Sequence, residues 1–177
     1  AALHLRERSW DGEIVLIGQE PHTPYERPPL SKSVLTEGVS PPLLSSAEQL
    51  QELQIKFLQG CQVAEIDRQS HRIRLQNDEC FPYDKLLLAT GASARRLTCI
   101  GSEHALVLRN LDEALALRFL LAPGKHLILI GAGFIGLELA ASARKLGCQV
   151  TVLEMAPRIL RRAVPAKIAE VVASEHK

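Results

Sequence analysis

The sequence has few aromatic residues and no cysteine or histidine spacing of the kind that forms redox pairs or metal sites. Aromatic residues make up 4% of the 177 residues and hydrophobic residues 46%. Leucine, isoleucine, valine and alanine must therefore fill the core, as in many α/β proteins. The four cysteines (Cys61, Cys80, Cys99 and Cys148) form no CxxC pair, and the six histidines are scattered. We expect free thiols in a reducing compartment and no metal site.

An excess of one charge and a long apolar run are also missing. The net charge is +1, which argues against a nucleic-acid-binding face, since such faces are normally basic. The longest apolar run, residues 127–137, is shorter than the roughly 20 residues that span a bilayer. His4, Arg6, Glu7 and Arg8 interrupt any secretory signal. These features predict a cytoplasmic protein that binds neither nucleic acid nor membranes.

The first half of the chain predicts a parallel strand, a long loop and a small meander. Residues 1–20 read as a helix end, a turn and a buried strand, Glu13–Gly18, that ends near an acid. Residues 19–45 are proline-rich and irregular. Ser45 and Glu48 predict a capping box that opens a helix to about Gln54. Further strands are expected at 55–58, 63–67, 73–75, after the Asn77-Asp78 turn, and at 86–89.

The second half predicts a helix followed by a complete βαβ unit. A helix is expected from Asp112 to the Pro123-Gly124 break. After it we expect a strand at 126–130, a helix that ends at Gly147, a strand at 149–153 and a helix from about Pro165. The chain is therefore expected to be α/β. It should contain two Rossmann-like, parallel-sheet nucleotide-binding domains and a small antiparallel β-meander, with both domains incomplete.

A glycine turn between the strand and the helix carries the most specific chemistry. Gly131, Gly133 and Gly136 form a GxGxxG pattern that follows a strand, opens a helix and leads to Glu154 about 20 residues later. Gly131 permits the tight turn, Gly133 lets a pyrophosphate approach the backbone, and Gly136 lets the helix pack on the strand. Phe134 and Ile135 lie in the first helical turn, where unpaired amides attract an anion.

The acid at the end of the second strand predicts which dinucleotide binds. Glu154 can accept hydrogen bonds from both ribose hydroxyls and would repel a 2′-phosphate, which favours NADH over NADPH. Two interpretations remain open for Arg158, Arg161 and Arg162. They could hold a 2′-phosphate, or they could form a solvated helix face.

Several stretches together resemble one family. They are WDGEIVLIGQEPHTPYERPPLSK (10–32), LLLATGA (86–92), LRNLDEALALR (108–118) and IGAGFIGLELAASARKLGCQVTVLE (130–154). In this order they resemble the FAD-dependent NADH:ferredoxin reductases of bacterial Rieske dioxygenase and cytochrome P450 systems, which have a pyridine nucleotide-disulfide oxidoreductase-like fold. PYERPPLSK is the most specific of these stretches.

The resemblance implies that the chain is a fragment of a longer protein. Residues 1–110 would form an FAD-binding domain whose first strand and glycine loop are missing. Residues 111–177 would form the N-terminal half of an NAD-binding domain. The rest of that domain, a second FAD segment and a C-terminal interface domain would follow.

The resemblance also implies roles for individual residues at the two cofactors. Lys32 would lie beside the flavin ring near its reactive nitrogen, and Glu138 would meet the nicotinamide carboxamide; these two are the catalytic candidates. An exposed loop lysine and a helix-dipole acid are the respective competing interpretations. The remaining FAD-binding candidates are Gln19, Glu20, Arg27, Val63, Ala89, Thr90, Gly91 and Arg109. Gln19 stands where the family has the acid that binds the FAD ribose, and Glu20 could substitute for it.

The implied activity is electron transfer from NADH through FAD to a small [2Fe–2S] ferredoxin, which feeds an aromatic-ring dioxygenase or a P450. A disulfide reductase would need a vicinal dithiol, and a peroxide- or oxygen-reducing flavoprotein would need a cysteine beside the flavin. The PPLSK segment has no cysteine. Two further interpretations are another flavin-dependent NADH oxidoreductase of this fold and a truncated NAD-binding module without catalytic activity.

Overall fold

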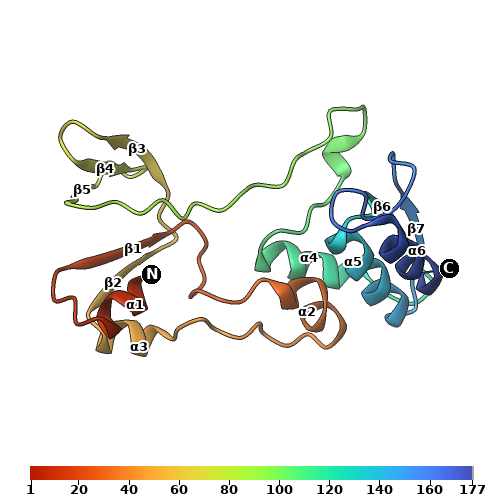
Figure 1. The fold of residues 1–177 in the computed structure, drawn as a ribbon, viewed down its shortest axis with the longest axis horizontal. Helices are drawn as coiled ribbons and strands as arrows, with labels where there is room; N and C mark the ends of the chain where they lie inside the picture. The colour runs from red at the N-terminus through yellow and green to blue at the C-terminus, as the bar shows by residue number, and fades with distance from the viewer. Residues whose placement is uncertain (177) are drawn as a thin grey trace. The chain divides into compact units, whose positions relative to one another are not determined.

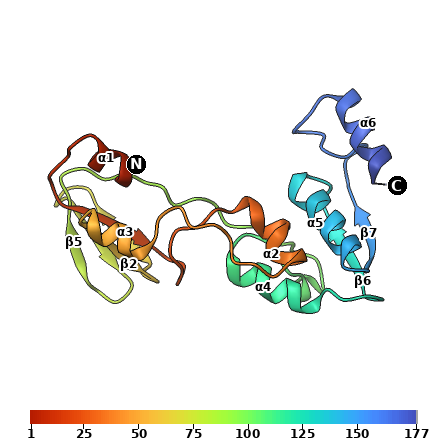
Figure 2. The same ribbon diagram turned by 90° about the horizontal axis from the view of Figure 1, so that it is seen from below.

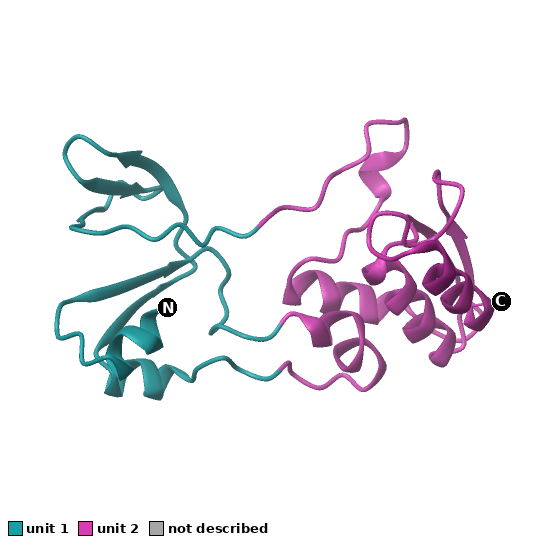
Figure 3. Ribbon diagram, viewed as in Figure 1, with its two compact units in different colours: residues 1–26, 42–91 teal, residues 27–41, 92–177 magenta. Residues whose placement is uncertain are grey.

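The computed structural model describes residues 1–176, which form two compact units (Figures 1 and 3). Unit 1 comprises residues 1–26 and 42–91, and unit 2 comprises residues 27–41 and 92–177. No helix in the described part of the chain is long and apolar enough to cross a membrane. Each unit has its own parallel strand pair, as the predicted α/β fold requires.

Unit 1 is built on a parallel pair of strands, β1 (Ile14–Gly18) and β2 (Ile55–Gln59). Ile14 lies opposite Ile55, and these two side chains form a buried core with Leu50 of helix α3 (Ala47–Glu52). Helix α1 (Ala2–Glu7) is fastened by Arg6, whose guanidinium donates to four backbone carbonyls, those of Trp10, Gly12, Leu53 and Gln54. The predicted strands at 13–18 and 55–58 are confirmed.

The predicted meander is also confirmed. Strands β3 (Val63–Asp67), β4 (Arg72–Leu75) and β5 (Cys80–Pro82) pair antiparallel in that order. Ile73 and Leu75 of the middle strand are buried, as their alternation with arginine predicts.

Two local predictions in unit 1 are wrong. Residues 86–89 form no strand, and the Leu87 side chain is 70% exposed. A strand needs a hydrogen-bonded neighbour, and none of residues 1–176 pairs with this segment. The cap of α3 is Ser46, whose Oγ accepts the Gln49 N–H at 3.1 Å, whereas Ser45 donates to the Gln49 side chain. Ser46 and Gln49 repeat the capping spacing one residue later, so the helix begins there.

Unit 2 contains the second parallel pair, β6 (His126–Ile130) and β7 (Gln149–Leu153). Helix α5 (Phe134–Lys145) connects them and lies alongside β7, and α6 (Ala166–Glu175) follows beyond the end of that strand (Figure 2). Gly147 ends α5 with φ +82°, as expected of a glycine after a helix. This βαβ unit and the helix from Pro165 agree with the prediction.

A segment from the proline-rich stretch packs in unit 2. It contains the 3₁₀ helix η1 (Pro28–Ser31) and the short helix α2 (Ser33–Thr36), which packs against α4 (Leu111–Leu120) and α5. Val34 and Leu35 have no exposed surface. A second 3₁₀ helix, η2 (Ser102–His104), lies in the connector before α4. The compact units thus divide the chain differently from the predicted boundary at residue 110, and the division into FAD and NAD domains stays a prediction.

Residues 27–41 leave unit 1 and pack in unit 2, and we call them the excursion. The residues just before and just after the excursion are joined by backbone hydrogen bonds. The Glu26 N–H donates to the Pro42 carbonyl and the Leu44 N–H to the Pro24 carbonyl, both at 2.8 Å. Tyr25 and Leu43 form the antiparallel bridge between them. The two ends of the excursion are therefore held side by side within unit 1.

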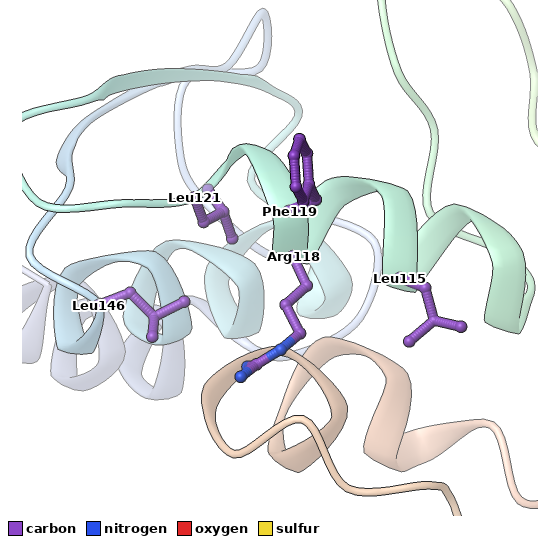
Figure 4. Close-up of a pocket in the computed structure, with 5 residues that line it drawn as sticks. All are labelled: Leu115, Arg118, Phe119, Leu121 and Leu146. Atoms are coloured by element: carbon purple, nitrogen blue, oxygen red, sulfur yellow. The ribbon is translucent and has the colours of Figure 1, made fainter.

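Arg118 of α4 secures the far end of this excursion. Its guanidinium donates to the Leu35 carbonyl and extends toward the orange ribbon of α2, whereas Phe119 points away from it (Figure 4). A cavity of about 300 Å³ lies here, lined by Leu115, Arg118, Phe119, Leu121 and Leu146. Helix α4 itself starts with a capping box in which Asn110 and Glu113 exchange hydrogen bonds. The start of α4 lies one residue before the predicted Asp112.

We predict that Gly38→Ala destabilises the protein more than Gly124→Ala does. Both glycines have positive φ (+74° and +81°), but a Cβ at Gly38 would lie 2.7 Å from the Arg118 guanidinium, while one at Gly124 meets nothing within 4 Å. The shared backbone cost is about 1 kcal/mol. Urea unfolding should show an additional loss of about 1–2 kcal/mol for Gly38→Ala. If both variants lose the same free energy of unfolding, the Arg118 side chain moves aside without cost and the prediction is wrong.

Candidate functional site

The glycine turn after β6 has the geometry of a dinucleotide-binding turn. Gly131 has φ +106°, a conformation that side chains oppose. A Cβ on Gly136 would lie 2.2 Å from the Gly131 carbonyl oxygen, so this close packing of helix on turn requires glycine. A Cβ on Gly133 would meet nothing within 4 Å, so that side of the turn is open. The conformation of Gly131 and the close packing of Gly136 agree with the structural roles predicted for them, while the role of Gly133 toward a pyrophosphate stays a prediction.

Helix α5 presents its N-terminus at this turn. Gly133 is its N-cap and provides no side-chain cap, and Phe134 and Ile135 in its first turn are 56% and 52% exposed. The first amides of a helix have no intrahelical acceptor and lie at its positive end. A diphosphate on the open side of Gly133 would meet these amides, so the turn fits the predicted ligand.

The turn also borders a cavity of about 510 Å³ within unit 2, a volume in the usual range for ligand pockets. Gly131, Ile135 and Gly136 contribute to one part of its wall. Strand β6 and the connector before α4 form most of the rest, with Leu117 of α4 and Leu139 of α5, and Arg95 and Arg96 are among the polar residues.

Glu154 lies at the end of β7 and joins the strand to the glycine turn. Its Oε2 accepts the Ala132 N–H at 2.8 Å and its Oε1 accepts the Ala156 N–H at 2.7 Å. These bonds, that from Ala156 first, lower the pKa of the carboxyl below its usual value, and Arg162 adds to the effect. Glu154 is therefore an anion at neutral pH, held at the end of β7 against the glycine turn.

The segment after β7 supports the turn. Ala132 and Leu137 are buried with Leu160, whose N–H donates to the Ala132 carbonyl at 2.9 Å. Residues 155–164 are bends and turns, so the expectation that the three arginines form a helix face is wrong. Arg158 donates to the carbonyls of Ile159, Arg161 and Val164, because the chain here curls around its guanidinium. Its role in this structure is to hold the loop.

Lys32 and Glu138 are brought into direct contact. The Lys32 Nζ lies 2.7 Å from the Glu138 Oε2, and the Ser31 hydroxyl donates to the same oxygen at 2.6 Å. Burial raises the pKa of Glu138, but the hydrogen bonds from Lys32 and Ser31 outweigh it and the net shift is downward. A segment near the start of the chain thus meets the first turns of α5. The resemblance predicted a role for each residue but not this pairing.

The two predicted FAD-binding arginines also lie together in unit 2. The Arg27 guanidinium donates to the Arg109 carbonyl at 2.5 Å, and the Arg109 Nε donates to the Ala92 carbonyl at 2.9 Å. Glu113 accepts the Arg109 N–H at 2.6 Å. The start of α4 therefore holds both arginines close to the segment that carries Lys32.

The other predicted FAD-binding residues lie in unit 1. Gln19 follows β1 and its amide donates to the Gln62 side chain at 3.3 Å, next to Val63 at the start of β3. Glu20 accepts a hydrogen bond from the hydroxyl of the buried Tyr25. These residues gather at the carboxyl end of the β1–β2 pair, where α/β sheets bind nucleotides. Ala89, Thr90 and Gly91 lie apart from them in sequence, on an exposed irregular stretch.

Sequence reasoning missed three polar residues that hold the candidate residues. Tyr25 binds Glu20, Ser31 binds Glu138, and the Ser142 hydroxyl donates to the Ser31 carbonyl at 2.6 Å. Tyr25 and Ser31 lie inside PYERPPLSK and could have been noticed there. Ser142 follows Glu138 by four residues and so shares its helix face, which is the one available signal. Residues 1–176 contain no group of three potential metal ligands.

We predict that Gly133→Ala and Gly136→Ala separate binding from folding. Gly133 has φ −82° and open space around it, so alanine should lower the thermal midpoint only slightly, as a poorer N-cap, while blocking the pyrophosphate and raising the NADH dissociation constant at least about tenfold. Gly136→Ala should instead cost about 2 kcal/mol or more of stability, since a backbone oxygen cannot move aside. Calorimetric NADH titration and thermal unfolding measure both. Unchanged NADH affinity in Gly133→Ala would contradict the assigned site.

Comparisons with known proteins agree with this geometry. The chain is 38% identical, over 99% of its length, to the ferredoxin–NAD(+) reductase component of the p-cumate 2,3-dioxygenase system of Pseudomonas putida. It is 41% identical, over 100% of its length, to the ferredoxin–NAD(+) reductase component of the 3-phenylpropionate/cinnamic acid dioxygenase of Photorhabdus laumondii subsp. laumondii. It covers 44% and 46% of these relatives, so it spans less than half of their length.

A solved structure and a family model extend the match. The ferredoxin reductase of the CYP199A2 system from Rhodopseudomonas palustris superimposes with a TM-score of 0.94 at 38% identity, covering 99% of this chain and 44% of that one. The family model described as pyridine nucleotide-disulphide oxidoreductase matches residues 1–177. Because this model matches the full length of the chain, the chain belongs to the pyridine nucleotide-disulphide oxidoreductase family.

Proposed function

We propose that this chain is part of an FAD-containing reductase that passes electrons from NADH to a small [2Fe–2S] ferredoxin, which in turn feeds an aromatic-ring dioxygenase or a P450. The names of the relatives support this activity, since each of the three compared proteins is a ferredoxin reductase. The four cysteines form no CxxC pair, so the proposal includes no dithiol mechanism. A cytoplasmic location, with free thiols in a reducing compartment, is part of the same proposal.

The contact between Lys32 and Glu138 is the observation that carries the proposal. Lys32 belongs to the segment that resembles the flavin-side motif, and Glu138 to the helix that opens at the dinucleotide turn. Their 2.7 Å ion pair joins these two segments within unit 2. A module that only bound NAD would not require this link.

Each cofactor would be held by residues already described. For NADH these are the open face of Gly133 and the first amides of α5, which would bind the diphosphate, and Glu154, which would accept the ribose hydroxyls. For FAD the resemblance gives two separate groups of candidates, Arg27 and Arg109 of unit 2 and Gln19, Glu20, Val63, Ala89, Thr90 and Gly91 of unit 1.

In this proposal Glu138 acts on NADH and Lys32 acts on FAD. When bound, FAD supplies the hydride acceptor and the conversion from two-electron to one-electron transfer. Both contacts to Glu138 from residues 1–176 use Oε2, so Oε1 can accept the carboxamide N–H₂ of NADH and orient its ring. Lys32 contributes a positive charge that favours a reduced, negatively charged ring beside it.

The proposal predicts that the complete protein purifies with bound flavin and passes electrons from NADH to a [2Fe–2S] ferredoxin. Oxidised flavin should absorb near about 380 and 450 nm, and NADH should bleach the longer-wavelength band anaerobically. Ferredoxin reduction can be followed through cytochrome c as the final acceptor. NADH binding without any flavin would instead indicate an inert nucleotide-binding module.

Glu154 is expected to decide between NADH and NADPH. Glu154→Gln removes the charge but keeps the shape, so the NADH dissociation constant should rise roughly tenfold while that of NADPH falls or stays constant. Because the pKa of Glu154 is lowered, wild-type NADH affinity should be constant between about pH 6 and 8 and weaken only in acid, where the carboxylate becomes protonated. Glu103→Gln, at an exposed acid of η2, serves as the control and should change neither affinity.

A further inference from the structure

Two buried serines join the Lys32 segment to helix α5. Ser31 and Ser142 are each 5% exposed, whereas the side chains of Lys32 and Glu138 are 51% and 34% exposed. The Ser142 hydroxyl donates to the Ser31 carbonyl at 2.6 Å, and the Ser31 hydroxyl donates to Glu138 Oε2 at 2.6 Å. The half-exposed ion pair therefore rests on a buried pair of hydrogen bonds.

The direction of the Ser142 hydroxyl is informative. A serine inside a helix commonly donates to the carbonyl three or four residues earlier in its own helix. Ser142 instead donates across 111 residues of sequence to a segment that unit 2 receives from the proline-rich stretch. It stands one turn after Glu138 on the same face of α5. One helix face thus holds the Ser31 residue at two points, its carbonyl and its hydroxyl.

An exposed ion pair would not fix these geometries unaided. Ion pairs with solvent access contribute little energy and restrict their long side chains weakly. Buried hydrogen bonds between short side chains have few alternative arrangements, so they define position more sharply. The Ser31 hydroxyl and the Lys32 ammonium both contact Oε2, and this arrangement determines where Oε1 points.

We propose that Ser142 is a positioning residue: by holding the Ser31 carbonyl it sets the Ser31 hydroxyl and the Lys32 ammonium on Glu138, and so orients the Glu138 carboxylate. This inference rests on the proposed function for its catalytic meaning, since Glu138 would orient the nicotinamide. The placement of the carboxylate can nevertheless be measured without either cofactor. Lys32 is the charged side chain whose field acts on Glu138.

The experiment compares Ser142→Ala and Ser31→Ala with the wild type in the complete protein. Carbon-13 NMR of labelled glutamate side chains follows the ionisation of Glu138, whose signal is assigned by its loss in Glu138→Gln. Both serine variants should raise the pKa of Glu138 toward its ordinary value, because the donor at Oε2 is removed or displaced. In the flavin-loaded protein the rate of flavin reduction at saturating NADH should fall roughly three- to tenfold, with a smaller change in NADH affinity.

Ser45→Ala is the matched control. Ser45 is the third buried serine among the described residues, also 5% exposed, and it donates to Gln49 in unit 1. It should alter neither the Glu138 titration nor the reduction rate. A Glu138 titration in Ser142→Ala that matches both the wild type and Ser45→Ala overturns the proposal. If Ser142→Ala does not fold, Ser142→Cys, which keeps the side-chain shape but donates only a weak hydrogen bond to the Ser31 carbonyl, decides by the same titration.

The two proposals can fail separately. A wild-type protein that binds no flavin would refute the reductase activity, yet the Glu138 titration would still show whether Ser142 places the carboxylate. Conversely, normal flavin reduction in the wild type together with an unchanged Glu138 titration in Ser142→Ala would refute the positioning role alone.

Discussion

The hydrogen bonds on Glu138 are the constraint on which the candidate site depends. Oε2 of this carboxylate accepts from residues 31 and 32, which lie more than a hundred residues earlier in the chain. Without that contact, the segment that resembles a flavin-side motif and the helix of the dinucleotide turn would be two unrelated features. The buried side chains of α2 bring the segment near α5, and the polar contacts then fix its position.

Two glycines of the turn are required by the backbone geometry, and the third leaves one side of the turn accessible. Gly131 and Gly136 are required by the protein itself, since one has positive φ and the other lies against a carbonyl oxygen. Gly133 satisfies no internal requirement and is surrounded by open space. Glu154 completes this arrangement by accepting the Ala132 amide of the same turn. The turn is therefore shaped by its own packing while one side is kept open for a ligand.

Much of this could be predicted from sequence because its signals are local. The strand, glycine turn, helix and acid of residues 126–154 follow one another, and each has its own residue pattern. The strand at 86–89 was predicted wrongly because an apolar run does not reveal whether a pairing neighbour exists. The cap at Ser46 was missed because two serines compete at adjacent positions. The spacing of four residues places Ser142 on the helix face of Glu138, but nothing in a single sequence indicates its contact with Ser31.

Because residues 27–41 pack in unit 2, neither unit can be expressed separately by cutting the chain at a single point. The chain passes from unit 1 to unit 2, returns at residue 42 and crosses again after residue 91. Neither unit is a continuous stretch of polypeptide. A recombinant piece that starts at residue 92 would include the whole glycine turn but would lack α2, leaving bare the apolar surfaces of α4 and α5 that Val34 and Leu35 cover. Such a piece is expected to aggregate, so the nucleotide-binding half is best dissected by point substitution.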